Sequence, residues 1–166
     1  LHLSEKELPA FLKELYSYDE YNLTALSIKL LTLTLQRPGE IRGARWSEFN
    51  LKEAIWHIPA NRMKRGRDHL VPLSKQALEI IKMIKNLSGD GEVLFPGRIS
   101  NKKPISDVSM IKMTKKLSDN KMTPHGARHT GSTILNENNF NRDGLSTNFL
   151  MLKITKFAEP TIKLNT

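Results

Sequence analysis

The sequence feature that most constrains the fold is a largely apolar run from Leu23 to Leu35, which ends shortly before Pro38 and Gly39. The run is long enough for a helix, and a helix that is apolar around most of its circumference is stable when it is buried. Proline and glycine then interrupt the helix. We therefore predict a buried helix over 23–35, a short amphipathic segment over 40–45, and Arg37 at the junction between them.

Signals for helices and strands alternate along the rest of the chain. Ser4 and Glu7 form a capping-box pattern before apolar residues at helical spacing, which predicts a first helix to about Tyr16. A loop rich in glycine and proline is expected over 88–104. Strand-like composition is found over 49–51, 54–58 and 69–73, and further helical patterns over 75–87, 106–117 and 124–135. These patterns predict an α+β domain that is mostly helical, with a small three-stranded antiparallel sheet.

Length and charge define the class of partner. The 166 residues suffice for one domain, and 26 Lys and Arg against 17 Asp and Glu give a net charge of +9. Such a surplus favours a polyanion, with nucleic acid ahead of an anionic membrane surface. We find no run of 18 apolar residues and no apolar signal core at the start, so we expect a cytoplasmic protein. The absence of cysteine excludes disulfides, thiolate zinc sites and cysteine nucleophiles.

Three basic motifs are each ambiguous when they are considered alone. Arg37 is also consistent with an ordinary surface arginine after a helix. Lys64 is also consistent with one solvated charge among several in the basic cluster 62–67. His125 and His129 have a spacing that suits a metal, but no glutamate follows His125 and no third ligand is evident. Their order along the chain is more informative: an arginine beside a Pro-Gly break, a lysine on a hairpin, then His-x-x-Arg-His at the start of a helix.

With this order, the chain resembles the catalytic domain of the tyrosine recombinase, or phage integrase, family. The resemblance is closest to prophage-type integrases and is carried by residues 37–49, 71–74, 94–96 and 122–130. It covers about residues 1–143, which we expect to form an incomplete catalytic domain without the family's arm-binding and core-binding regions. The fold that it implies is the mostly helical recombinase domain with a three-stranded sheet.

The family's chemistry is phosphodiester exchange, and the resemblance gives Arg37 and Arg128 the roles of its two arginines. The phosphorane-like state gathers negative charge on two non-bridging oxygens, and fixed cations must face that charge. A guanidinium fork holds two such oxygens at once, whereas the lysine ammonium is a single point charge. We therefore expect Arg37 and Arg128 to clamp the reacting phosphate.

The resemblance also implies roles for neighbouring residues. Lys64 would donate a proton to the leaving 5′-oxygen, and His125 would assist proton transfer around the attacking group. Glu40 is expected to support the site, and His129 and Trp46 to be structural, the first through hydrogen bonding and the second by filling core volume. The family needs no metal and no cofactor, because a covalent 3′-phosphotyrosyl link conserves the bond energy.

The sequence departs from the family after Asp143. A later histidine or tryptophan and then a tyrosine nucleophile are expected, but Tyr16, Tyr18 and Tyr21 are the only tyrosines in the chain. If the third base of each codon is joined to the first two bases of the next codon, permitted codons spell the family's Leu-x-His and Ala-Tyr-Asn. We therefore expect 144–166 to be a frame-shifted tail, the alternative being an unrelated, divergent tail.

Three functions remain open at this point. The first is a prophage integrase fragment that binds DNA but is catalytically inactive because the nucleophile is missing. The second is an active protomer that receives a tyrosine in trans, and the third is a DNA-binding or regulatory remnant without catalysis. All three predict double-stranded DNA, at attachment sites, as the partner, with other integrase protomers as further partners. They also place the chain in the bacterial cytoplasm, associated with the nucleoid.

Overall fold

Helix α2 (Leu23–Thr34) is the central element of the computed structural model, which describes residues 1–137. Every residue from Ala25 to Thr34 is buried, and the helix contacts five other helices. The Asn22 side chain caps its start by accepting a hydrogen bond of 3.0 Å from the Ala25 amide. Leu35 ends it in the left-handed region, with φ of 53°. The predicted buried helix is therefore confirmed, and it stops at the surface two residues before Arg37.

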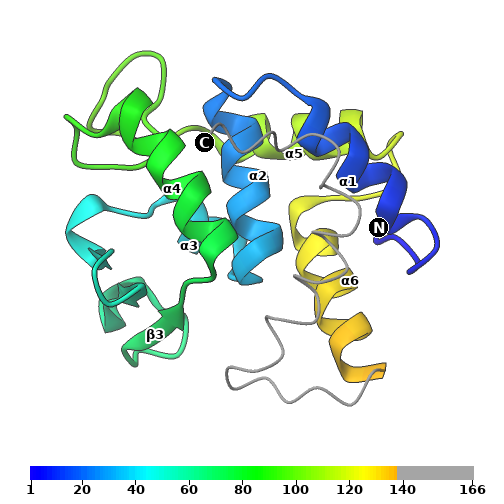
Figure 1. Ribbon diagram of the computed structural model, residues 1–166, viewed down its shortest axis with the longest axis horizontal. Coiled ribbons are helices and arrows are strands. Elements are labelled where there is room, and N and C mark those ends of the chain that lie inside the picture. Colours follow the sequence, from blue (N-terminus) through cyan, green and yellow to red (C-terminus); the bar gives the residue numbers. More distant parts are fainter. Residues whose placement is uncertain (138–166) are drawn as a thin grey trace.

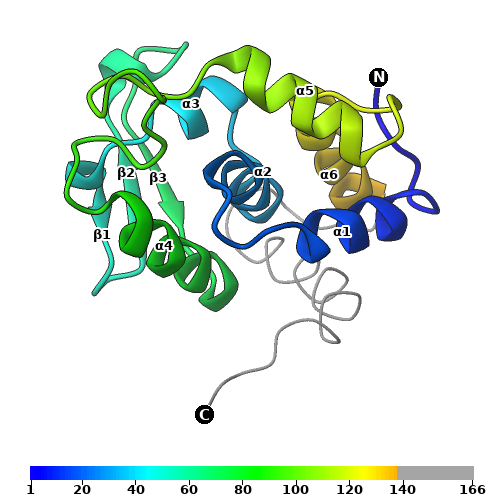
Figure 2. The same ribbon diagram turned by 90° about the horizontal axis from the view of Figure 1, so that it is seen from above.

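Four longer helices surround α2. Figure 2 shows α2 between α4 on one side and α1 and α6 on the other, with α5 across them. Each helix buries one apolar stripe against α2 or its neighbours, as the helical spacing of the sequence predicts. Their bounds are Leu8–Ser17 for α1, Lys75–Ser88 for α4, Asp107–Leu117 for α5 and Pro124–Glu137 for α6 (Figure 1).

The short helix α3 (Pro38–Arg42) begins two residues earlier than the amphipathic segment predicted from Glu40. Proline has no amide hydrogen, but the first residues of a helix need none, and its fixed φ suits that position. Pro38 therefore starts α3 as well as preventing α2 from continuing. As a result, Arg37 occupies the N-cap position of α3.

The three-stranded antiparallel sheet is confirmed, in the order β1 (Phe49–Asn50), β2 (Ile55–Ile58) and β3 (His69–Pro72). Trp56 pairs with Phe49 on one side and Val71 on the other. Its indole is fully buried and lies parallel to the Phe49 ring, with centroids 5.1 Å apart. Two short 3₁₀ helices, Trp46–Glu48 and Ala60–Arg62, flank the first two strands and were not predicted.

The segment expected to be a glycine- and proline-rich loop over 88–104 is irregular, but its middle belongs to the core. Val93, Leu94 and Phe95 are almost completely buried. The Leu94 amide donates to the Ala44 carbonyl at 3.0 Å, and the Phe95 carbonyl accepts from the Ile105 amide at 2.8 Å. These bonds satisfy backbone groups that have no strand partner, which allows a loop to be buried.

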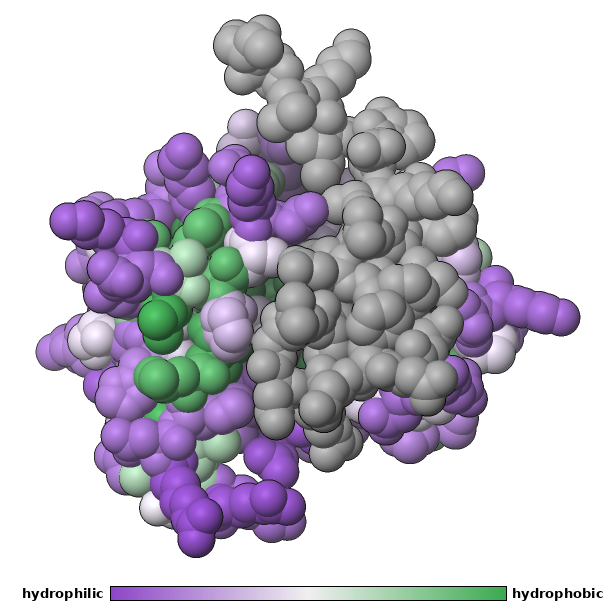
Figure 3. All heavy atoms as spheres, turned by 60° about the horizontal axis from the view of Figure 1, so that its bottom comes forward, coloured by the Kyte–Doolittle hydropathy of each residue, from purple (hydrophilic) through white to green (hydrophobic). Residues whose placement is uncertain are grey.

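The described surface is mostly polar. Figure 3 shows hydrophilic side chains around a smaller hydrophobic area on one face. Within residues 1–137, no helix combines the length and the apolar composition that a membrane span requires. The tail 144–166, with its predicted change of reading frame, lies outside the described residues.

Replacing Phe95 tests whether the buried loop is part of the core. Phe95→Ala should lower the free energy of unfolding by about 3–5 kcal/mol, because it removes a large side chain that is completely buried. The matched control is Ile99→Ala in the same loop, since Ile99 is fully exposed and its removal should cost under about 0.5 kcal/mol. Urea denaturation measures both, and equal losses would contradict this description of the loop.

Candidate functional site

Arg37 is fixed at the junction between α2 and α3 by Glu40. The Glu40 carboxylate accepts a hydrogen bond of 3.0 Å from the Arg37 amide and one of 3.1 Å from its Nη1. The Glu40 side chain is 5% exposed, whereas that of Arg37 is 34% exposed. The buried carboxylate therefore orients the guanidinium and leaves part of it open to solvent, which is the geometry expected of a supporting residue.

Arg128 reaches the same junction from a distant part of the sequence. Its Nε donates a hydrogen bond of 2.7 Å to the carbonyl of Leu35, 93 residues earlier. That carbonyl lies beyond the end of α2 and has no partner within the helix. The bond holds one edge of the Arg128 guanidinium two residues from Arg37. The structure thus brings the two predicted arginines together at one end of α2.

His125 lies on the same side of the molecule as the start of α3. It is exposed in the first turn of α6 and lines a cavity of about 370 Å³ together with Pro38 and Gly39. Arg42, Met110 and Thr123 are also among the lining residues. The histidine motif and the Arg37 motif therefore share one concave surface between α3, α5 and α6.

Lys64 is exposed in the turn between β2 and β3. It makes no hydrogen bond or ion pair with another residue in 1–137, so its approach to a phosphate remains a prediction. The turn around it is well defined, because Asp68 accepts a hydrogen bond of 2.8 Å from the Ala60 amide and lies 3.0 Å from His57 Nε2. These contacts hold the pKa of Asp68 below its ordinary value, the Ala60 amide having the largest effect.

The two residues with expected structural roles differ from expectation in detail. His129 is exposed and contacts the His2 ring edge-on, with centroids 4.9 Å apart, rather than through a hydrogen bond. Trp46 is partly buried and donates from its indole to the Ser88 carbonyl at 3.1 Å, whereas Trp56 fills the core. In the described part of the chain, no three His, Asp or Glu side chains form a group suited to a metal.

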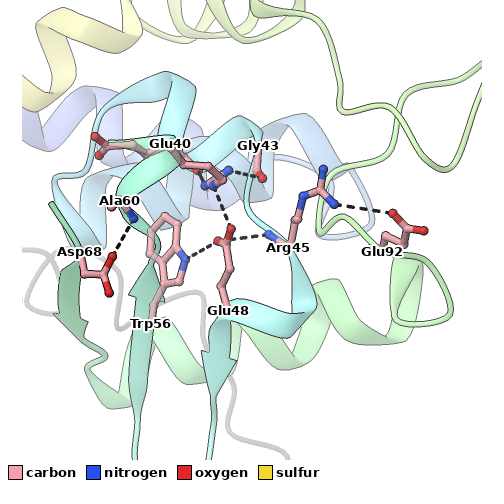
Figure 4. Close-up of polar contacts among 9 residues, drawn as sticks. Glu40, Gly43, Arg45, Glu48, Trp56, Ala60, Asp68 and Glu92 are labelled. Carbon is pink, nitrogen blue, oxygen red and sulfur yellow. Dashed lines mark hydrogen bonds and ion pairs between the residues drawn. The ribbon is translucent and has the colours of Figure 1, made fainter. Parts of the chain in front are cut away.

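Sequence reasoning missed two residues that connect the hairpin to α3. Arg62 donates to the carbonyls of Glu40 and Gly43 and forms an ion pair of 2.8 Å with Glu48. Figure 4 shows the Glu48 carboxylate facing both the Trp56 indole, at 2.9 Å, and the backbone of Arg45. The capping spacing from Arg45 to Glu48 was a local signal for Glu48, but no sequence pattern marks Arg62.

Tyr18 and Tyr21 lie at the opposite end of α2 from Arg37, whereas the Tyr16 hydroxyl lies against Thr32 in the last turn of that helix. Tyr16 belongs to α1, and Tyr18 and Tyr21 lie between α1 and α2. The 12 residues of α2 separate Tyr18 and Tyr21 from Arg37 by about 18 Å. Lys29 lies over the Tyr16 ring, 5.1 Å from its centroid, and burial raises the pKa of the Tyr16 hydroxyl. The length of α2 thus separates Tyr18 and Tyr21 from the arginines, and the Tyr16 hydroxyl is enclosed against the same helix.

The sequence pattern of the phage integrase family matches residues 2–147. The chain belongs to this family. Prophage integrase IntA of Escherichia coli K12 is 43% identical over 112 residues, which are 67% of this chain and 27% of that protein. The chain thus spans about a quarter of the length of that relative.

Two solved structures share the fold. The XerA recombinase is 19% identical with a TM-score of 0.65, and a lambda integrase dimer bound to a core site is 17% identical with a TM-score of 0.61. Each alignment covers 95% of this chain and 58% of the other. The predicted catalytic-domain fold of a tyrosine recombinase is therefore confirmed.

Asp68 predicts a pH dependence of the hairpin. Because its pKa is lowered in the folded state, its stabilisation is complete above the ordinary value of 3.8 and is lost as the pH falls through the lower folded-state value. The NMR shift of the Ala60 amide proton should follow this titration, and Asp68→Asn should abolish it. Asp90→Asn, an exposed substitution outside the hairpin, should preserve it. An unchanged Ala60 titration in Asp68→Asn would refute the assignment.

Proposed function

We propose that this chain is part of the catalytic domain of a prophage-type DNA integrase, and that it binds duplex DNA around one phosphodiester. The observation that carries the proposal is the Arg128 Nε bond to the Leu35 carbonyl, which joins the second arginine motif to the first. Its prophage integrase relatives and the DNA-bound lambda integrase support DNA as the partner. Such a partner places the chain with the nucleoid in the bacterial cytoplasm. In an assembled recombinase, other integrase protomers bind the same DNA.

The two arginines stabilise the phosphate at the stage when its negative charge is greatest. Arg37 is oriented by Glu40, and Arg128 by the Leu35 carbonyl, so neither guanidinium needs to reorganise when charge develops. A guanidinium has five N–H groups, so Arg37 has donors beyond the one that it gives to Glu40. The site therefore stabilises a trigonal-bipyramidal phosphate more strongly than a tetrahedral one.

Proton transfer is assigned to two exposed residues. Lys64, at the tip of the hairpin, donates a proton to the departing 5′-oxygen, and His125, in the first turn of α6, assists the proton on the attacking side. No metal or cofactor takes part in these steps. Integration follows when strands are cleaved and rejoined through a phosphotyrosyl intermediate.

The chain by itself lacks the nucleophile for this reaction, and we propose that it binds DNA without cleaving it. Tyr18 and Tyr21 lie about 18 Å along α2 from Arg37, and the Tyr16 hydroxyl is buried against Thr32, whereas in-line attack requires a nucleophile within about 3–3.5 Å of the phosphorus. An active assembly would need a tyrosine donated by another protomer. A regulatory DNA-binding role would use the same basic surface without any tyrosine.

A phosphorane mimic tests the arginine clamp directly. The probe is a duplex with a one-phosphate gap, in which orthovanadate bridges the 3′- and 5′-hydroxyls. Arg37→Ala should weaken binding of the vanadate-bridged duplex about 100-fold. Arg37→Lys should restore little, because one ammonium cannot replace the guanidinium fork. Fluorescence anisotropy at fixed salt measures the affinities.

The control for this experiment is the intact duplex, for which we expect a Kd on the order of micromolar and a steep loss of affinity with salt. Arg37→Ala should change that affinity only about twofold, as should Arg67→Ala in the exposed hairpin. If Arg67→Ala reduced vanadate-dependent binding as much as Arg37→Ala, bulk charge rather than a site would explain the binding.

A suicide substrate tests the missing nucleophile. The chain alone should form no covalent adduct with a nicked duplex from which the cleaved fragment diffuses away, as judged by denaturing gel electrophoresis. An intact integrase of the same family, run in parallel, supplies the positive control. An adduct mapped by mass spectrometry to any side chain of this protein would disprove the inactive assignment.

A further inference from the structure

Arg62 is the buried link between the two parts of the proposed site that are most distant in the fold. It lies at the base of the β2–β3 hairpin, two residues before Lys64, and its side chain is only 18% exposed. A cation that contacts DNA phosphates is expected to be exposed, as Arg65 and Arg67 are in the same hairpin. The position of Arg62 therefore calls for a role other than direct DNA binding.

The contacts of Arg62 all lie on α3 and on the segment that follows it. Nη2 donates to the Glu40 carbonyl at 2.8 Å, Nη1 donates to the Gly43 carbonyl, and Nε lies 2.8 Å from Glu48 Oε1. In a helix as short as α3, the terminal carbonyls have no partner within the helix. One guanidinium thus satisfies the end of the helix whose first turn orients Arg37.

The absence of a side chain at Gly43 leaves room for this contact. A Cβ added at Gly43 would lie 2.6 Å from Arg62 Nη1, so the guanidinium occupies the space that any other residue's side chain would need. Glu48 is fixed in turn, because its other oxygen accepts from the Trp56 indole at 2.9 Å and from the Arg45 amide at 3.3 Å (Figure 4). Both sides of the Arg62 contact are therefore rigid.

We infer that Arg62 is a positioning residue that sets the placement of the Lys64 hairpin relative to Arg37. A chain of contacts connects the two: Lys64 follows Arg62 closely in the hairpin backbone, and the Arg62 side chain bonds the Glu40 carbonyl. The Glu40 side chain in turn accepts a hydrogen bond from Arg37. The sheet register and Asp68 fix the hairpin internally, whereas Arg62 attaches it to α3. The attachment of the hairpin to α3 is inferred from the geometry alone. Its importance for catalysis rests on the proposed function.

The first readout is structural and needs no DNA. The chain has no cysteine, so spin labels can be attached specifically to Gly39→Cys on α3 and Arg65→Cys on the hairpin. Both positions are exposed, and a Cβ at Gly39 meets nothing within 4 Å. Pulsed electron paramagnetic resonance should give one narrow distribution of label-to-label distances when Arg62 is present, and a broad one in Arg62→Met. Arg67→Met, a matched loss of an exposed hairpin cation, should leave the distribution narrow.

The second readout is the gain in affinity that vanadate gives on the gapped duplex. Arg62→Met should reduce this gain on the order of tenfold, because a small misplacement of reacting groups has a large cost. Its affinity for intact duplex should change little. Arg62→Lys should not restore the gain, since a single ammonium nitrogen cannot span the positions that Nε, Nη1 and Nη2 of the planar guanidinium occupy. Gly43→Ala should reproduce the loss with Arg62 still present.

Two controls separate the possible failures. Arg62→Met combined with Glu48→Gln removes the buried carboxylate left without its partner, and thermal melting shows whether folding stability returns. If stability, the narrow distance and the vanadate gain all return together, Arg62 only stabilises the fold and the inference is overturned. A narrow distance distribution in Arg62→Met overturns it as well. If the unsubstituted chain shows no vanadate gain, the proposed function fails, and the distance measurement alone decides the inference.

Discussion

The burial of α2 is the constraint on which the rest of the molecule depends. Because every residue from Ala25 to Thr34 is enclosed by other helices, the chain has to emerge at Leu35, where the left-handed turn ends the helix. The Leu35 carbonyl then has no helical partner, and the Arg128 guanidinium supplies one. A requirement of helix termination therefore brings the second arginine motif to the first. The same contact that completes the fold assembles the candidate site.

The cations around the candidate site include two physical classes. Arg37 and Arg62 are partly or largely buried, and each is paired with an almost fully buried carboxylate, Glu40 or Glu48. Burial makes such pairs specific in geometry, because neither partner can be left without the other. Lys64 and its exposed neighbours in the hairpin turn have no such partner within the described residues and contribute to long-range attraction for a polyanion. Under the proposed function, affinity for DNA and precision at one phosphate would thus rest on different side chains.

The sequence predicted the elements of this fold well, because periodicity and capping are local properties. The buried helix, the three strands and the long helices around them follow from the spacing of apolar residues. A family resemblance supplied Arg37 and Arg128 as site residues, and the structure places both beside the end of α2, while their catalytic roles stay predictions. The burial of Phe95 within an irregular segment was not predictable, since the backbone bonds that permit it come from Ala44 and Ile105. The role of Arg62 was not predicted for the same reason, because the carbonyls that it bonds belong to residues 19 and 22 positions earlier in the sequence.

In this architecture, the groups proposed to bind the phosphate are positioned independently of any nucleophile. The arginines are held by Glu40 and by a backbone carbonyl, so their placement requires no tyrosine. Tyr18 lies at the other end of α2, where it contacts Lys116, and the Tyr16 hydroxyl is buried against Thr32 of α2. A nucleophile is thus an independent addition to a preformed anion site, whether it comes from the same chain or from a neighbour.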